Sequence, residues 1–386
     1  MMKQKVKLIF LTMCLFSSGF CQNSRVFMLH REGISMGELS LGDEFNGQQL
    51  NQDLWYGYYP WGGLSMKAKT YTDPTMCHQK SGVLELKVDT TSQWRSFPNW
   101  MLDTAEIRKN NIILKDGNLE INRLTSALWS KTPFKYGFFE CKCMLPKGQG
   151  LWPAFWLYGG QPNEEIDIME AKGERRKSYH VDIHCPDRCD RIKKWGVLDR
   201  PFGRWINTKQ NITDEWVTFS GLWTPEGIRF YYNGTLMASH QVQFKTEMNL
   251  IANFSMAMDK GPFSPGPNKK TKFPSTYSID YIRAWEIPDI KHVNLWENTS
   301  DTKFIKMIPQ SNQNIKFEYG GDFCLGDELL IYREDSTTHS GEGVFLILDL
   351  TAKEQWIDYS FWPTGKYWLH VSHDKYSLRE PIITLP

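Results

Sequence analysis

The chain has no excess of charge of either sign, no internal repeat and no low-complexity tract. It contains 45 Lys and Arg against 44 Asp and Glu, which gives a formal net charge of +1 over 386 residues. Such a balance excludes a general electrostatic attraction to nucleic acid. A hydrophobic content of 41% also excludes an intrinsically disordered chain. We therefore expect a folded protein, long enough for one large domain and a smaller one.

Long apolar runs are missing after the N-terminal segment. Residues 1–21 carry three lysines, an apolar run over 8–16 and small residues at 17–19, a pattern typical of a secretory signal peptide that is cleaved after Cys21. A lipidated Cys21 is the alternative, which the bulky Phe20 disfavours. No later segment offers the roughly 18 consecutive apolar residues of a membrane span. The sequence thus predicts a secreted protein, periplasmic, cell-surface or extracellular, that does not span a membrane.

Cysteines are few and do not form a metal-binding pattern. Six of them follow the signal peptide: Cys77, Cys141, Cys143, Cys185, Cys189 and Cys324. In an exported protein some of these are expected to pair. Cys141 and Cys143 face the same way on a strand-like run and are poorly placed to bond each other, whereas Cys185 and Cys189 flank a short loop and are the best local pair. No spacing matches structural zinc.

Helical periodicity is nearly absent as well. From residue 41 to 286 short alternating runs, such as 82–88 and 227–232, are separated by Gly, Pro, Asn and Asp turns. This pattern predicts an all-β sandwich or barrel, and the turn Asn233-Gly234 predicts a tight hairpin. Three further alternating runs, 328–332, 344–348 and 365–371, follow Pro288. We predict one β domain at residues 22–288 and a small accessory β-sandwich, of unassigned role, at residues 289–386.

The segment 163–170 brings three carboxylates together. On a helix, Glu165, Asp167 and Glu170 would fan around the cylinder and make no common site. On a strand, Glu165 and Asp167 share a face, and Glu170 points to the opposite face unless one extra residue is accommodated. A β-bulge at Ile168-Met169 supplies that residue. The alternative is an edge strand with solvated acidic side chains, which its apolar opposite side disfavours.

Three carboxylates on one face suit the retaining hydrolysis of a glycosidic bond. That reaction needs one ionised carboxylate as nucleophile and one protonated carboxyl as acid, about 5 to 5.5 Å apart. Glu165 is the predicted nucleophile, and Glu170 the acid and later the base. Asp167 is expected to hydrogen-bond the nucleophile and, by its negative charge, to help keep Glu170 protonated. No cofactor is expected for this chemistry.

Several motifs around this strand form a larger pattern. They are Asp-Glu-Phe-Asn-Gly at 43–47, Gly-Leu-Trp-Pro-Ala-Phe-Trp at 150–156, Leu-Trp-Thr-Pro at 222–225 and Ile-Asp-Tyr-Ile-Arg at 279–283. Together they resemble glycoside hydrolase family 16, over most of residues 41–286. The resemblance implies a β-jelly-roll sandwich of two curved antiparallel sheets with an open cleft, and a double-displacement mechanism. The bulged strand resembles the laminarinase and agarase branches, since lichenase-like members have one residue fewer.

Four further residues are candidates for substrate binding. Trp152 and Trp156 share one face of their strand, which is either the cleft or the core; by the resemblance Trp152 is the better candidate for a sugar platform. Trp129 matches a cleft-edge segment of the family. His184 matches a cleft histidine that would lie near the nucleophile or the sugar beside it. The chain holds 16 Trp, 16 Tyr and 22 Phe, a surplus that suits either sugar stacking or a β-sandwich core.

The resemblance also implies a structural calcium ion on the convex side. Asp280 and Gly47 match segments that supply its oxygen ligands, the type that calcium prefers. Its expected role is stability rather than catalysis.

The leading hypothesis is a secreted, monomeric endo-β-glycosidase that hydrolyses a polysaccharide, with β-1,3(4)-glucan as the first choice. Residues 171–204 hold ten Lys or Arg against five Asp or Glu, which favours instead an endo-β-galactanase on agar, porphyran, carrageenan or a host galactan, because such cations bind sulfate. A transglycosylase would use the same intermediate. A non-catalytic carbohydrate-binding protein is the alternative from another class, but the loss of a carboxylate expected of it is not seen.

Overall fold

The computed structural model describes residues 37–160, 163–186, 191–194, 198–208, 210–225, 227–240 and 242–287, and seven strands between residues 304 and 385. In this part of the chain nearly all regular structure is β-strand, as predicted. The helical elements described are α2 (Thr104–Lys109) and two 3-10 turns, η1 (Pro74–Met76) and η2 (Asn99–Met101). No helix among these residues is long and apolar enough to cross a membrane. The predicted signal peptide, residues 1–21, lies outside the described residues.

The first of the two sheets is antiparallel, and we call it the back sheet. Its members are β1 (Leu39–Asp43), β5 (Cys77–Lys80), β6 (Val83–Arg95), β9 (Gly137–Met144), β16 (Val217–Thr224), β17 (Gly227–Tyr232), β18 (Thr235–His240) and β20 (Ser275–Trp285). The spatial order is β5, β6, β20, β9, β16, β17, β18, and β1 lies beside the second half of β20. The predicted hairpin at Asn233-Gly234 joins β17 to β18, and both turn residues have positive φ.

The other sheet, the site sheet, carries the three carboxylates. It runs in the order β2 (Trp55–Tyr56), β8 (Asn118–Phe134), β19 (Met248–Met256), β10 (Leu151–Tyr158), β11 (Glu165–Glu170), β12 (Ser178–His184) and β15 (Arg204–Asn207). One face packs on the back sheet, with Phe155 and Ile166 from the site sheet and Leu84, Phe139 and Phe219 from the back sheet in a common core. We call the other face of the site sheet its open face. This architecture confirms the predicted jelly-roll sandwich.

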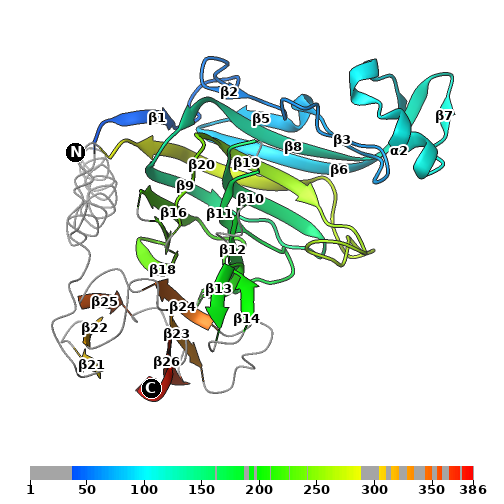
Figure 1. Ribbon diagram of the computed structural model, residues 1–386. Helices are drawn as coiled ribbons and strands as arrows, with labels where there is room; N and C mark the ends of the chain where they lie inside the picture. The colour runs from blue at the N-terminus through cyan, green and yellow to red at the C-terminus, as the bar shows by residue number, and fades with distance from the viewer. Residues whose placement is uncertain are drawn as a thin grey trace, which may run out of the picture.

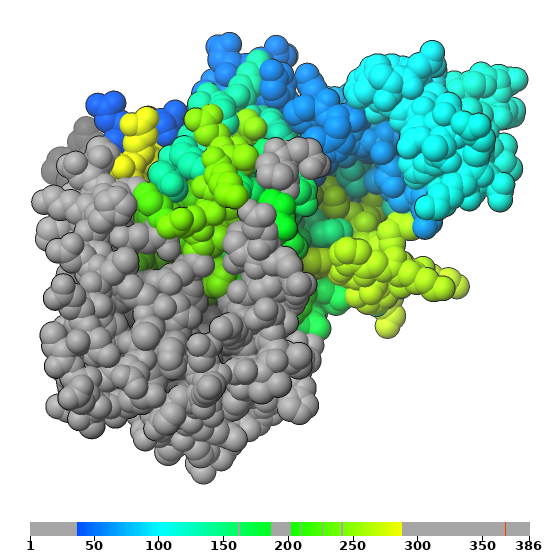
Figure 2. All heavy atoms as spheres, in the orientation of Figure 1, coloured from blue at the N-terminus to red at the C-terminus, as the bar shows by residue number. Residues whose placement is uncertain are grey.

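Beyond the sandwich, β6 and β8 continue as a pair and carry a projection, here called the finger, residues 93–121. It contains η2, α2 and β7 (Leu114–Lys115), and it lies beside the short strands β3 (Leu64–Ser65) and β4 (Thr70–Thr72) (Figure 1). Figure 2 shows the surface hollowed between this cyan projection and the yellow-green segment that follows β19. The finger therefore stands at one end of the hollow.

The remaining strands include one, β24 (Val344–Asp349), that pairs in parallel with β18 of the back sheet. They are β13 (Arg191–Lys194) with β14 (Leu198–Pro201), and then β21 (Phe304–Pro309), β22 (Asn314–Gly320), β23 (Glu328–Arg333), β24 (Val344–Asp349), β25 (Glu354–Asp358), β26 (Gly365–His373) and β27 (Tyr376–Leu385). The three runs predicted after Pro288 coincide with β23, β24 and β26. The boundary at residue 288 and the separate accessory domain stay predictions.

The described cysteines agree with the expected pattern. Cys141 and Cys143 are buried free thiols on β9 and are not bonded to each other, and Cys77 is also free. Cys185 is disulfide-bonded. Its predicted partner, Cys189, lies outside the described residues.

The predicted bulge in β11 is confirmed by the register of both neighbouring strands. On β10, the consecutive residues Phe155 and Trp156 face Met169 and Asp167, so that Ile168 has no partner. The register with β12, on the other side of β11, also shifts between Asp167 and Glu170. Ile168 and Met169 both point into the core. The bulge thus turns Glu170 to the open face while it buries two apolar side chains.

A glycine in the opposite sheet makes room for the bulge. A Cβ on Gly221, in β16, would lie 2.9 Å from both Cγ1 and Cδ1 of Ile168, closer than carbon atoms pack. The small residue on the back sheet and the extra residue on the site sheet therefore fit together.

We expect Gly221→Ala to destabilise the protein by about 1 to 3 kcal/mol, because it overpacks the core beneath the bulge. Activity should fall as well, since the collision moves the strand that carries the carboxylates. Thermal unfolding of Gly221→Ala, Ile168→Val and the double variant measures the coupling. The double variant should recover part of the loss, because Val lacks the Cδ1 atom; strictly additive losses would show that the two sites do not interact.

Candidate active site

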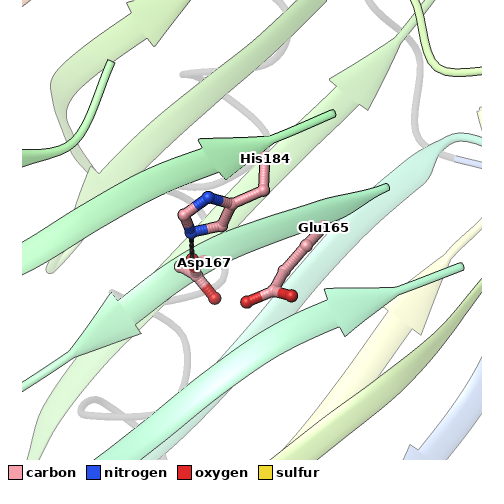
Figure 3. A group of neighbouring side chains, drawn as sticks. All are labelled: Glu165, Asp167 and His184. Atoms are coloured by element: carbon pink, nitrogen blue, oxygen red, sulfur yellow. Dashed lines mark ion pairs between the residues drawn. The ribbon is translucent and has the colours of Figure 1, made fainter. Parts of the chain in front are cut away.

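Strand β11 presents Glu165, Asp167 and Glu170 on the open face of the site sheet. Residues directly opposite one another on antiparallel strands share a face. The carboxylates face Tyr158, Trp156 and Ala154 on β10, and His184, Asp182 and His180 on β12. Glu165 and Asp167 point toward each other, with His184 above them (Figure 3). The structure therefore brings together the three carboxylates that the sequence singled out.

The start of this strand is fixed by a fourth carboxylate, Glu164, which is buried. It accepts hydrogen bonds from the backbone N–H groups of Lys245 and Thr246, at 2.9 and 2.8 Å, and from the Thr246 hydroxyl at 2.7 Å. Burial alone would raise the pKa of Glu164, but these hydrogen bonds outweigh it and the pKa is lowered. Glu164 is thus ionised and fixes the start of β11. The next residue, Glu165, is the first of the three site carboxylates.

Asp167 is the most deeply buried of the three, with 3% of its surface exposed. Burial raises its pKa well above the ordinary value, and the charges of Glu170, Glu165 and Asp182 raise it further. From the sequence, we expected a negative charge here. Its position between other carboxylates favours instead the protonated form, which can donate a hydrogen bond to Glu165.

The pKa of Glu165 is also raised, first by burial and then by the charge of Glu170. Two groups act in the opposite direction, namely the charge of His184 and the hydrogen bond with Asp167. His184 Nε2 lies 3.3 Å from Asp167 Oδ2 and 3.6 Å from Asp182 Oδ2, and the first contact is the dashed line of Figure 3. His184 thus lies beside the nucleophile candidate, where the sequence placed it.

Both oxygens of Glu170 have partners. The indole N–H of Trp152 donates to Oε1 at 3.0 Å, and His180 Nδ1 lies 3.2 Å from Oε2. Trp152 in turn stacks on Phe263, with ring centroids 4.5 Å apart and planes inclined by 9°. Trp152 therefore orients Glu170, and its role as a sugar platform stays a prediction. We predicted no role for His180 from the sequence, although it lies four residues before His184 and on the same face of one strand.

A group of aromatic side chains covers the other end of the open face. Trp156 donates its indole N–H to Asn253 Oδ1 at 2.8 Å. Trp129 is only 7% exposed, because Trp61 meets it edge-on with centroids 5.2 Å apart. Trp61 itself is 50% exposed and stacks on Tyr59 at 4.7 Å. Trp61 was also missed, and the aromatic, glycine-rich run Tyr-Tyr-Pro-Trp-Gly-Gly at 58–63 was the signal that could have found it.

The predicted calcium ligands lie elsewhere, on the back sheet and the loop after β1. Asp280 sits where the register of β20 shifts, and its Oδ2 is 2.7 Å from Lys142 Nζ. An ammonium group beside this carboxylate competes with a cation there. The described residues contain one group of three side-chain ligands close enough together for a metal ion, Glu165, Asp167 and His184, and Asp280 does not belong to it. Calcium at Asp280 and Gly47 stays a prediction.

We expect Glu165→Gln to raise the melting temperature at pH 7. A raised pKa in the folded state means that ionisation of Glu165 costs stability as the pH rises from the ordinary glutamate pKa, about 4.3, through the folded value. The neutral amide avoids this cost. The difference in melting temperature between variant and wild type should therefore shrink as the pH falls toward 4. Glu38→Gln, an exposed site, is the control and should change little at either pH.

A destabilised Glu165→Gln variant at pH 7 would contradict the raised pKa, because it would mean that the carboxylate is favourably placed as an anion. A difference in melting temperature between variant and wild type that does not depend on pH would also contradict the raised pKa.

The chain is similar to several known proteins. The sequence model of the family Glycosyl hydrolases family 16 matches residues 99–283. The glucan endo-1,3-beta-glucosidase A1 of Niallia circulans is 27% identical over 63% of the chain, which spans 37% of that relative. The glucan endo-1,3-beta-glucosidase of Cryptopygus antarcticus is 24% identical over 63% of the chain and 90% of its own length.

The fold also has solved counterparts. The endo-beta-1,3-glucanase from Pyrococcus furiosus superposes with a TM-score of 0.51 and 22% identity, and the match covers 65% of this chain and 95% of that one. The likeness to this structure agrees with the jelly-roll sandwich described above. Over residues 99–283 the chain is similar to the glycosyl hydrolases, family 16.

Proposed function

We propose that this protein is a secreted, retaining, endo-acting hydrolase of a β-linked glucan and that it works as a monomer. One observation carries the proposal: the bulge in β11 turns Glu170 to the same face as Glu165 and Asp167. Retaining hydrolysis needs two carboxyl groups on one side of the sugar, and they must hold their protons differently. Glu170 accepts a hydrogen bond from Trp152 and lies beside His180, whereas Glu165 lies beside Asp167 and His184.

In the first step, Glu165 attacks the anomeric carbon while Glu170 gives its proton to the departing glycosidic oxygen. Trp152 and His180 hold the carboxyl group of Glu170 in place for this transfer. In the second step, Glu170 takes a proton from water, which attacks the same carbon and releases Glu165. The proton on Asp167 donates to Glu165 and so stabilises the carboxylate both before the attack and after its release.

The choice of glucan rests on the relatives, two of which are named as glucan endo-1,3-beta-glucosidases. Three of the basic residues that favoured a sulfated galactan already have partners in the structure. Lys172 pairs with Glu174, the guanidinium of Arg175 lies 4.3 Å above the ring centroid of Trp205, and Arg176 pairs with Asp214. Each of these contacts leaves less of the cation available for a sulfate group, and β-1,3(4)-glucan therefore comes first.

A substrate panel tests the proposal. Laminarin and lichenan should be cleaved with a rapid fall in viscosity and a mixture of product sizes, whereas agarose, porphyran, carrageenan and a host-type galactan should resist. Products longer than the starting oligosaccharide would indicate a transglycosylase. Binding of laminarin without any cleavage would indicate a carbohydrate-binding protein and overturn the proposal.

The roles of the two glutamates predict different losses. Glu165→Gln should lower kcat on laminarin by at least about 10⁴-fold, because the amide cannot attack the anomeric carbon. Glu170→Gln should lower kcat by about 10²- to 10⁴-fold on laminarin. The loss should be much smaller on an aryl glucoside whose leaving group needs no proton. Proton NMR should show that the first product of the wild type is the β-anomer, and an α-product would contradict a retaining mechanism.

The proton on Asp167 predicts a contrast between two substitutions. Asp167→Asn keeps an N–H donor toward Glu165 and should retain kcat/KM within about tenfold, whereas Asp167→Ala should lose about 10- to 100-fold, the value of a hydrogen bond to a charged group. Equal losses in the two variants would show that the negative charge of Asp167, rather than its proton, is what the reaction uses.

A further inference from the structure

The open face of the site sheet carries a straight row of side chains that leads away from the carboxylates. Asp167, Trp156, Ile251 and Trp129 are directly opposite one another on β11, β10, β19 and β8. Because neighbouring strands are about 4.8 Å apart, β8 lies roughly 14 Å from β11. A polysaccharide that crosses the strands at the carboxylates therefore reaches the Trp129 end of the row after a few sugar units.

Trp61 stands at that end. Its ring centroid lies 5.2 Å from that of Trp129 and 5.9 Å from that of Tyr158, with both rings met edge-on. One of its faces is stacked on Tyr59, with planes inclined by 11°. Half of its surface remains exposed. Trp61 thus lies at the end of the row and keeps an exposed surface that a ligand can contact.

A second exposed indole comes from the finger and lies next to Trp61 in space. A Cβ on Gly62 would lie 3.0 Å from Trp100 Cη2. The indole of Trp100 therefore packs against the backbone of the residue that follows Trp61, and this approach is possible because residue 62 has no side chain. Trp100 is 67% exposed, the largest exposure of any described tryptophan. Trp61 and Trp100 are neighbours although 39 positions separate them in the sequence.

The finger holds Trp100 in a fixed position. Met101, the next residue, packs into a small hydrophobic cluster formed by Met66, Phe97, Leu119 and Ile121. Met66 belongs to the same stretch of chain as Trp61, so this cluster ties the finger to the loop that carries Trp61. The carboxylate of Asp103 caps α2 by accepting the N–H of Ala105 at 2.7 Å. The two indoles are therefore held in place before a ligand arrives, which lowers the entropic cost of binding.

Two large exposed rings, one on residue 61 and the other packed against residue 62, indicate a ligand, because soluble proteins rarely expose such groups together. Indole rings stack on the apolar faces of sugars, and their N–H groups can bond sugar hydroxyls. We propose that Trp61 and Trp100 form a sugar-binding subsite at the finger end of the hollow, which holds a distant unit of the glucan chain and makes the enzyme select long chains. This inference rests on the proposed function, since it assigns the same substrate to a more remote surface.

The test compares a polymer with a short oligosaccharide. Trp100→Ala should lower kcat/KM on laminarin about fivefold to tenfold, the value of one stacking contact, and leave kcat/KM on laminaritetraose within about twofold. Trp100→Phe keeps an aromatic ring and should retain most of the activity on laminarin. The control is Trp216→Ala, because Trp216 is also exposed, at 42%, but precedes β16 in the back sheet; it should match the wild type on both substrates.

Direct binding gives a second readout that does not depend on turnover. In the Glu165→Gln background, titration calorimetry with laminarin should show an affinity about fivefold to tenfold weaker when Trp100→Ala is added. Loss of activity on both substrates alike, or no change on laminarin in either measurement, overturns the subsite. Failure of the wild type to cleave laminarin contradicts the proposed function instead, so the two failures are distinguishable.

Discussion

A carboxyl group enclosed by other carboxyl groups is the constraint on which the rest of this site depends. Asp167 lies in the floor of the open face, with 3% of its surface exposed, and the charges of Glu165, Glu170 and Asp182 act on it. Ionising all of these groups together would be very costly in a partly dry site. In the mechanism proposed above, a proton on Asp167 resolves the conflict, in line with the raised pKa of this group. This proton then serves the neighbouring Glu165, which has to be ionised to react.

The backbone is shaped to permit this arrangement. A regular strand would turn Glu170 into the core, where an acid could not meet a substrate. The bulge prevents this and uses the extra residue, Ile168, to fill space against Gly221 in the opposite sheet. Glu164 fixes the beginning of the same strand through its hydrogen bonds to Lys245 and Thr246. Core packing and strand register therefore determine together which carboxylates meet on the open face.

The bulge in β11 could be predicted because it follows from residues that are close together in the sequence. The spacing of Glu165, Asp167 and Glu170, together with the two-residue period of a strand, leaves a bulge as the one way to a common face. The partners of the side chains were not predictable in this way. Trp152 was a candidate sugar platform, and the sequence did not show that its N–H group donates to Glu170, because such a partner depends on the rotamer. Trp61 meets Trp129 only through the tertiary fold, and Lys142 reaches Asp280 only through the pairing of β9 with β20.

The loop that follows β19 touches the site through Phe263, on which Trp152 is stacked. The same loop is tied to the start of β10 and to the end of β11. Gln149 donates to the carbonyl of Gly266 at 2.9 Å, and Lys172 donates to that of Ser264. Any outward swing of this loop would remove the support of Trp152, and with it the hydrogen bond to Glu170. The position of this loop and the orientation of the acid are therefore coupled through Trp152.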